Sequence, residues 1–234
     1  MSDKAGKGVF YIGIANSLFF ILSFATSIAL ARILNVGNFG VYGVMVSLIS
    51  TVNIVFINGF KQAVSKFVSE EGCLSSKEKV FMFGLIFLAG LLIWAILFIG
   101  AEFVALLLND VSLVPIIQVV SFLVITYSIH TFFMGYINGL RRFKYEAGLR
   151  ALYGVIKAGF IVGLAALTLN VIYVFWGFVA ASVLIVTVGA LVYKKISFEN
   201  KNQRLKPSTV VKFFKFALPL MGFVLVTNIV LNLD

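Results

Sequence analysis

Charged and polar residues recur at helical spacing inside long apolar stretches of the sequence. The sharpest series is Glu146, Arg150, Tyr153 and Lys157, whose steps of 4, 3 and 4 place all four on one helix face. A lysine near the middle of an apolar span costs about 2.5–3.5 kcal/mol on membrane-insertion scales. Lys157 therefore predicts a water-filled cavity or a buried acidic partner, and a cationic cavity suits an anionic ligand such as a diphosphate. The alternative is that Lys157 extends its stem to the membrane surface.

Three other apolar stretches carry polar series of the same kind. They are Asn16, Ser23 and Ser27; Ser47, Thr51, Asn58 and Gln62; and Tyr127, His130 or Thr131, Met134 and Asn138. Polar side chains inside a membrane usually face the bundle interior or an aqueous cavity, so these faces predict the lining of a hydrated chamber. His130, the single histidine, fits a hydrogen bond between helices. The alternative is a proton relay, since histidine can change its charge near neutral pH.

No sequence signature of catalysis accompanies these series. HExxH, GxSxG, phosphate-binding-loop and paired-carboxylate patterns are absent, and one His and one Cys do not make a Cys/His metal site. The net charge of +10 could neutralise nucleic-acid phosphates. Its basic residues, however, lie in short segments between apolar runs and so serve membrane topology. We therefore expect no enzyme, no cofactor, no metal and no nucleic-acid partner.

The elements that must position these residues are membrane-spanning helices. The chain has 234 residues, 61% of them hydrophobic and 12% charged, whereas soluble domains are about 45–50% apolar and about 25% charged. A helix needs about 20 apolar residues to cross the bilayer. A partial seventh stretch begins near Phe213, after six complete ones: Val9–Ala31, Phe39–Phe60, Val80–Ala101, Val114–Tyr136, Ala147–Leu169 and Val171–Tyr193. The predicted fold is an all-α, multi-pass transmembrane helix bundle.

Basic residues predict the orientation of this bundle. All of them except Arg32 and Lys157 fall in the N-terminal tail or around the ends of the second, fourth and sixth spans. Because Lys and Arg accumulate on the cytoplasmic side, the N-terminus is expected in the cytoplasm. The predicted organisation is a six-helix lobe at 1–195, a cytoplasmic linker at 196–211 and the start of a second lobe at 212–234.

Four short segments carry a family resemblance. The first, Ala31–Gly43, is similar to a family turn written ARlLGpeeFGlyg, with Asn35-Val36 in place of the usual Gly-Pro. The others are Asn58–Phe67, Asn138–Lys144 and Phe214–Leu220. Together they resemble the polysaccharide (oligosaccharidyl-lipid) flippases of the multidrug/oligosaccharidyl-lipid/polysaccharide exporter superfamily, over essentially the whole chain.

This resemblance implies two six-helix lobes around a cavity that opens alternately to each side, with substrate held between them. The chain is then the N-terminal lobe of a MATE-like fold plus the beginning of the second. The implied activity is flipping of a lipid-linked oligosaccharide across the cytoplasmic (plasma) membrane for polysaccharide biosynthesis. The implied partners are an undecaprenyl- or dolichyl-type carrier, membrane lipids and glycan-assembly proteins. As a fragment, the 234 residues alone are not expected to flip lipid.

On this interpretation Arg32 lies at the outer mouth of the cavity, Lys157 within it and Arg150 at the inner mouth. The candidate substrate-binding residues are Arg32, Lys157, Arg150, Asn16, Asn58, Gln62 and His130. Two alternatives remain open. One is a drug/cation antiporter of the same superfamily, although it would be expected to carry an acidic residue in mid-span, which the complete spans lack. The other is a non-transporting membrane scaffold that assembles with glycosyltransferases.

Overall fold

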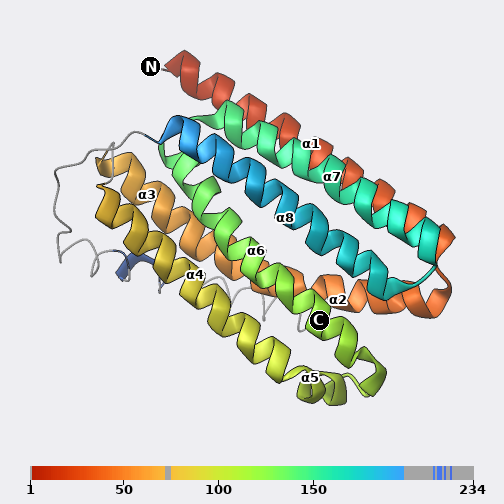
Figure 1. Ribbon diagram of the computed structural model, residues 1–234. Helices are drawn as coiled ribbons and strands as arrows, with labels where there is room; N and C mark the ends of the chain where they lie inside the picture. Colours follow the sequence, from red (N-terminus) through yellow and green to blue (C-terminus); the bar gives the residue numbers. More distant parts are fainter. Residues whose placement is uncertain are drawn as a thin grey trace.

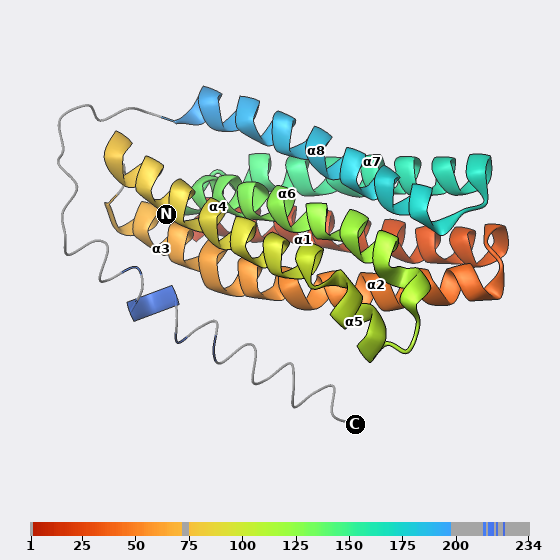
Figure 2. The same ribbon diagram turned by 60° about the horizontal axis from the view of Figure 1, so that its bottom comes forward.

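The computed structural model describes residues 2–71 and 75–197, together with 213, 215–217, 219 and 222. Long helices lie side by side along one common direction (Figures 1 and 2). They are α1 (Ser2–Ile33), α2 (Val36–Val55), α4 (Ser76–Ile99), α6 (Val114–Gly139), α7 (Phe143–Thr168) and α8 (Val171–Ile196). Six helices in the described ranges are long and apolar enough to cross a membrane. The predicted all-α, multi-pass bundle is confirmed.

Short helical elements extend or connect these spans. A π-helical turn, η1 (Phe56–Lys61), joins α2 to α3 (Gln62–Glu71). The second span therefore continues as helix beyond its predicted end at Phe60. Helix α5 (Ala101–Leu107) and the 3-10 turn η2 (Val111–Leu113) connect α4 to α6.

Side-chain caps explain where three of the long helices begin. The Asn35 side chain accepts a 2.8 Å hydrogen bond from the backbone N–H of Asn38. The residue that departs from the family's Gly-Pro pattern thus caps α2. Ser75 and Glu78 form a reciprocal capping box at the start of α4, and Asn170 caps α8. Each cap satisfies a backbone donor that has no partner within its helix.

Helix α6 lies at the centre of the bundle. It contacts α2, α3, α4, α5, α7 and α8, whereas α1 packs mainly against α7. Helix α8 lies between α7 and α6 (Figure 1). Outer helices present large apolar side chains outward, such as Phe20 and Phe24 of α1. This arrangement is expected where lipid surrounds the bundle and the polar groups must be satisfied inside it.

The connections between spans alternate between two ends of the bundle. The α1–α2 and α7–α8 turns meet at one end, where Asn38 Nδ2 donates a 3.4 Å hydrogen bond to the carbonyl oxygen of Leu169. The start of α1 and the α6–α7 turn lie at the opposite end, together with the neighbouring ends of α3 and α4 (Figure 1). Arg32 lies in the last turn of α1 and therefore at the first of these ends. The cytoplasmic location of the basic end stays a prediction.

Most of the predicted linker at 196–211 and of the predicted seventh helix at 212–234 lies outside the described residues. The described positions from 213 onward are helical. Phe213 is buried, with its ring centroid 5.7 Å from that of Phe67 in α3. The Lys66 ammonium lies 4.1 Å from the centroid of the Phe216 ring. These few residues of the predicted seventh helix therefore pack against α3.

The close contact between α3 and α6 depends on two glycines of α6. A Cβ atom at Gly139 would lie 2.5 Å from the Cβ of Val68 and 2.7 Å from the carbonyl oxygen of Ser65. A Cβ atom at Gly135 would lie 2.9 Å from the carbonyl oxygen of Lys61. Small residues four apart thus let the two backbones approach each other, as in other membrane helix pairs.

We expect Gly139→Ala to destabilise the protein by about 1–3 kcal/mol, because the added methyl group meets backbone that cannot turn aside. Gly163→Ala is the matched control, since a Cβ atom there meets nothing within 4 Å and alanine favours helix over glycine. Thermal unfolding of both purified variants in detergent checks this. Equal melting temperatures would contradict the close α3–α6 contact.

Candidate functional site

A buried carboxylate organises the basic end of the bundle. Glu146, in the first turn of α7, is only 1% exposed. Its Oε1 atom lies 2.7 Å from Lys61 Nζ and 3.8 Å from Arg150 Nη2. Its Oε2 atom accepts a 2.5 Å hydrogen bond from Asn138 Nδ2. Buried charges persist when they are paired and hydrogen-bonded, and Glu146 meets both conditions. We call Glu146, Lys61, Arg150 and Asn138 the Glu146 cluster.

The Glu146 cluster ties several helices together. Lys61 ends the π turn η1, Asn138 lies in the last turn of α6, and Arg150 lies one turn after Glu146 in α7. Arg150 Nη1 also donates a hydrogen bond to Asn16 Oδ1 of α1. Ser65 Oγ of α3 donates to Asn138 Oδ1 at 2.7 Å, which leaves the amide nitrogen to face the carboxylate. The cluster therefore depends on the mutual placement of α1, η1, α6 and α7.

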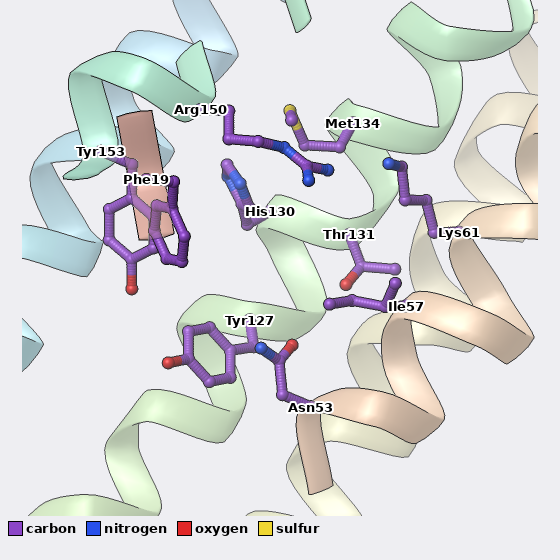
Figure 3. A pocket seen from close by; sticks show the side chains of 10 residues that line it. All are labelled: Phe19, Asn53, Ile57, Lys61, Tyr127, His130, Thr131, Met134, Arg150 and Tyr153. Atoms are coloured by element: carbon purple, nitrogen blue, oxygen red, sulfur yellow. The ribbon is translucent and has the colours of Figure 1, made fainter. Parts of the chain in front are cut away.

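Lys61 and Arg150 face a cavity of about 150 Å³ (Figure 3). Side chains of α1, α2, η1, α6 and α7 line it: Phe19, Asn53, Ile57, Lys61, Tyr127, His130, Thr131, Met134, Arg150 and Tyr153. The two cations lie on one side of the cavity, and Tyr127 and Asn53 lie on the other (Figure 3). The cavity is thus cationic at one side and uncharged at the other.

A larger cavity of about 500 Å³ adjoins the first along α3. Its lining residues are Ile57, Lys61, Gln62, Ser65, Lys66, Ser69, Asn138 and Phe216. Ile57 and Lys61 line both cavities and therefore form the wall between them. No group of three or more His, Cys, Asp or Glu residues suited to a metal ion occurs in the described part of the chain.

The predicted polar faces of the fourth and fifth spans meet at the first cavity. Arg150 lines it, and Asn16 of the first span lies beside it through its hydrogen bond to Arg150. The other lining residues from these two faces are Tyr127, His130, Thr131, Met134 and Tyr153. The structure therefore brings together Arg150, Asn16 and His130 of the candidate set.

The second span presents a different face from the predicted one. Asn53, Ile57 and Lys61 line the first cavity. Gln62 instead lines the adjoining cavity and donates a 3.3 Å hydrogen bond to Asn58 Oδ1. The π turn explains this shift. In a π turn the backbone hydrogen bonds join residues five apart, so each residue turns the chain by a smaller angle than in an α-helix. Residues four apart therefore stay on one face across the turn. A search for polar residues at helical spacing does not detect this face, because the apolar Ile57 stands between Asn53 and Lys61.

Lys157 and Arg32 do not line the cavity. The Lys157 ammonium lies 4.8 Å from the ring centroid of Phe178 and 5.3 Å from that of Phe19. Within the described ranges Lys157 forms no ion pair. The faces of these two rings therefore stabilise the mid-span cation, in place of the acidic partner that was one expectation. Arg32 is exposed at the opposite end of the bundle.

Sequence reasoning misses Lys61, Glu146 and Asn53 as members of the site. The sequence places Lys61 among the basic residues after the second span, and it shows Glu146 only as one member of a polar series. A usable signal is present nonetheless. An acid that opens an apolar helix needs a cation if it is buried, and Lys61 directly follows the apolar Phe60.

We expect Glu146→Ala to lower the free energy of unfolding by about 3–5 kcal/mol, because Lys61 and Arg150 lose their buried counter-ion. Glu70→Ala is the matched control. Its ion pair with Lys66 is 3.9 Å long and largely exposed, and such pairs contribute about 0–1 kcal/mol. Unfolding of both variants in mixed micelles measures the difference. Similar losses in the two variants would contradict the structural role of the Glu146 cluster.

Known proteins resemble the chain in sequence pattern and in fold. The family model described as "Polysaccharide biosynthesis protein" matches residues 5–234, which confirms the resemblance carried by the four sequence segments. No curated protein matches the chain. The fold is similar to the outward-facing conformation of a multidrug resistance MATE family transporter of the MOP superfamily, with a TM-score of 0.78 and 13% identity. That alignment covers 94% of this chain and 52% of the other.

Two further solved structures share the fold. A mutant MATE protein gives a TM-score of 0.74 at 11% identity, covering 92% of this chain and 52% of that protein. A MOP superfamily transporter from Pyrococcus furiosus gives 0.65 at 15% identity, with coverages of 95% and 53%. The chain thus spans about half the length of these proteins, and identities this low show a common fold alone. Its multi-pass helical bundle and the family match over nearly all its residues show that the chain belongs to the polysaccharide biosynthesis protein family.

Proposed function

We propose that the chain is part of a transporter that moves a lipid-linked oligosaccharide across the membrane and binds the carrier's phosphates between Lys61 and Arg150. The observation that carries this proposal is a pair of cations at a cavity within a bundle of apolar spans. The family description supports a role in polysaccharide biosynthesis. The MATE-like fold supports alternating access.

The chemistry of the two cations suits phosphate. The Arg150 guanidinium is a planar fork that can hold two phosphate oxygens, and the Lys61 ammonium is a compact charge beside it. Inside a water-poor bundle these contacts are stronger than at an exposed surface. The lipid tail of an undecaprenyl- or dolichyl-type carrier stays in the bilayer beside the bundle. The headgroup alone enters the cavity.

The charge balance favours an anion over a cationic drug. Lys61 and Arg150 stand against the single carboxylate of Glu146, so these three groups together keep one positive charge. A cationic drug would be repelled from this side of the cavity. The Pyrococcus furiosus neighbour is itself described by a binding pocket of reverse polarity that suggests a different function. A non-transporting scaffold needs no such cavity, and binding of the carrier's phosphates to the chain separates it from part of a transporter.

The remaining candidate residues take supporting positions in this proposal. Asn16 orients the Arg150 guanidinium, and His130 lines the cavity next to it (Figure 3). Gln62 lines the adjoining cavity, which the proposal assigns to later sugars, and donates a hydrogen bond to Asn58. Lys157 adds positive potential behind Phe19. Arg32 meets the headgroup at the opposite end, which the proposal assigns to the outer side of the plasma membrane.

We expect Lys61→Gln and Arg150→Gln each to weaken binding of undecaprenyl diphosphate by about 10- to 100-fold, the loss of one charge-assisted contact. Lys77→Gln is the control, because Lys77 is exposed at the same end of the bundle and lines neither cavity. Binding is measured in phosphatidylcholine nanodiscs that hold the whole chain. Equal affinity for undecaprenol, which has no phosphate, would sink the proposal.

A further inference from the structure

We infer that a groove between α7 and α8, on the outer surface of the bundle, binds an anionic phospholipid of the surrounding membrane. Its volume is about 400 Å³, within the range of ligand pockets, which is about 300–1,000 Å³. Its walls include Lys144, Tyr145, Gly148 and Leu152 of α7 and Val188 and Val192 of α8. We call it the α7–α8 groove. Among the described residues it shares no lining residue with either cavity of the candidate site, so the inference does not depend on the proposed function.

The α7–α8 groove lies on the face of α7 that is turned away from the cavity. Gly148 stands two residues after Glu146 and two before Arg150, which places it about 200° around the helix from each of them. Tyr145 and Leu152 are 36% and 40% exposed. A ligand in this groove therefore contacts the membrane side of the bundle and does not reach the Glu146 cluster.

The α7 side of the groove is open because it lacks a side chain at Gly148. Gly148 is exposed, and a Cβ atom there would meet nothing within 4 Å. The packing of the chain therefore does not fill this space. Leu152 of α7 and Val188 and Val192 of α8 surround it with apolar surface. Such walls suit the hydrocarbon part of a ligand.

Cations gather where the groove reaches the basic end of the bundle. Lys144 lines the groove itself, and Arg142 directly precedes α7. Lys195 continues the α8 face of Val188 and Val192, at steps of 4 and 3. Lys144, Arg142 and Lys195 are exposed, and none forms an ion pair with a described residue. Basic pockets of this kind between membrane helices bind the headgroups of anionic lipids.

The order of groups along the groove matches the order of groups in a phospholipid. Helix α7 begins and α8 ends at the basic end of the bundle (Figure 1). From Lys144 to Leu152 the helix extends eight residues, or about 12 Å, so the apolar walls lie deeper than the cations. Tyr145 stands beside Lys144, and tyrosine is common at the membrane surface. A phospholipid likewise holds its phosphate at the surface and its acyl chains below.

The test measures the binding of single lipids to the whole chain. The chain is purified in detergent and titrated with phosphatidylglycerol or with phosphatidylcholine of identical acyl chains. Native mass spectrometry then gives the dissociation constant of the first bound lipid. Phosphatidylglycerol carries a net negative charge, whereas phosphatidylcholine carries none. We expect phosphatidylglycerol to bind at least about fivefold more tightly, the contribution of one basic residue near a lipid phosphate.

Two variants locate the site. Gly148→Leu should abolish the preference for phosphatidylglycerol, because the new side chain fills the groove. Gly159→Leu is its matched control, since Gly159 is also exposed on α7, has nothing within 4 Å of a Cβ atom, and lies outside the groove. Lys144→Gln should weaken phosphatidylglycerol binding about fivefold. Lys77→Gln is the control for charge, because Lys77 is exposed at the same end and outside the groove.

Equal binding of the two lipids, or a preference that survives Gly148→Leu, overturns the proposal. It also fails if Gly159→Leu loses the preference as Gly148→Leu does, or if Lys77→Gln weakens binding as much as Lys144→Gln. The competing occupant is a polyprenyl carrier. Undecaprenyl phosphate should not displace phosphatidylglycerol from the first site, and displacement would assign the groove to the carrier instead. Binding of undecaprenyl diphosphate at Lys61 and Arg150 is a separate measurement, so the two proposals can fail independently.

Discussion

The ion pairs of the buried Glu146 carboxylate are the interaction on which the site depends. A carboxylate inside a membrane bundle is costly without partners, and Lys61, Arg150 and Asn138 supply three. The dependence runs in both directions. Long basic side chains inside a membrane tend to extend toward the surface, and the carboxylate holds Lys61 and Arg150 at the cavity instead. The acid behind this cavity thus keeps the two cations at its wall.

The π turn η1 is what brings Lys61 to that acid. Irregular helical backbone is tolerated in a membrane only where protein buries and satisfies it, and Gly59 and Phe60 of η1 are buried. Gly135 of α6 leaves room for the Lys61 carbonyl oxygen, which a side chain there would displace. Single π turns often mark functional sites. Here the turn has a definite effect: it aligns Asn53, Ile57 and Lys61 on the cavity wall.

The spans could be predicted from sequence because the thickness of the bilayer sets both their length and their apolar composition. The polar faces of α6 and α7 could also be predicted, since both helices are regular and periodicity carries over directly to geometry. Lys61 could not, because the apolar Ile57 interrupts the polar series that would join it to Asn53. The contacts of Lys157 with aromatic rings could not be predicted either, for another reason. Phe19 and Phe178 lie far from it in sequence, and phenylalanine is too common in spans to signal a contact.

The arrangement of charge also bears on how a transporter can release what it binds. Two cations without a counter-ion would hold a diphosphate tightly and would be costly to keep charged when the cavity is empty. With Glu146 in place, the resting cluster is already paired, and the anion of the proposed function would have to share the two cations with the carboxylate. The net binding free energy of the anion is then smaller, because the cations give up contacts with the carboxylate when they contact the anion. A site that alternates between two sides of a membrane needs such moderate affinity, because an anion held too firmly on one side never leaves on the other. On the proposed function, the acid that stabilises the empty bundle would thus also set an upper limit on how tightly the substrate is held.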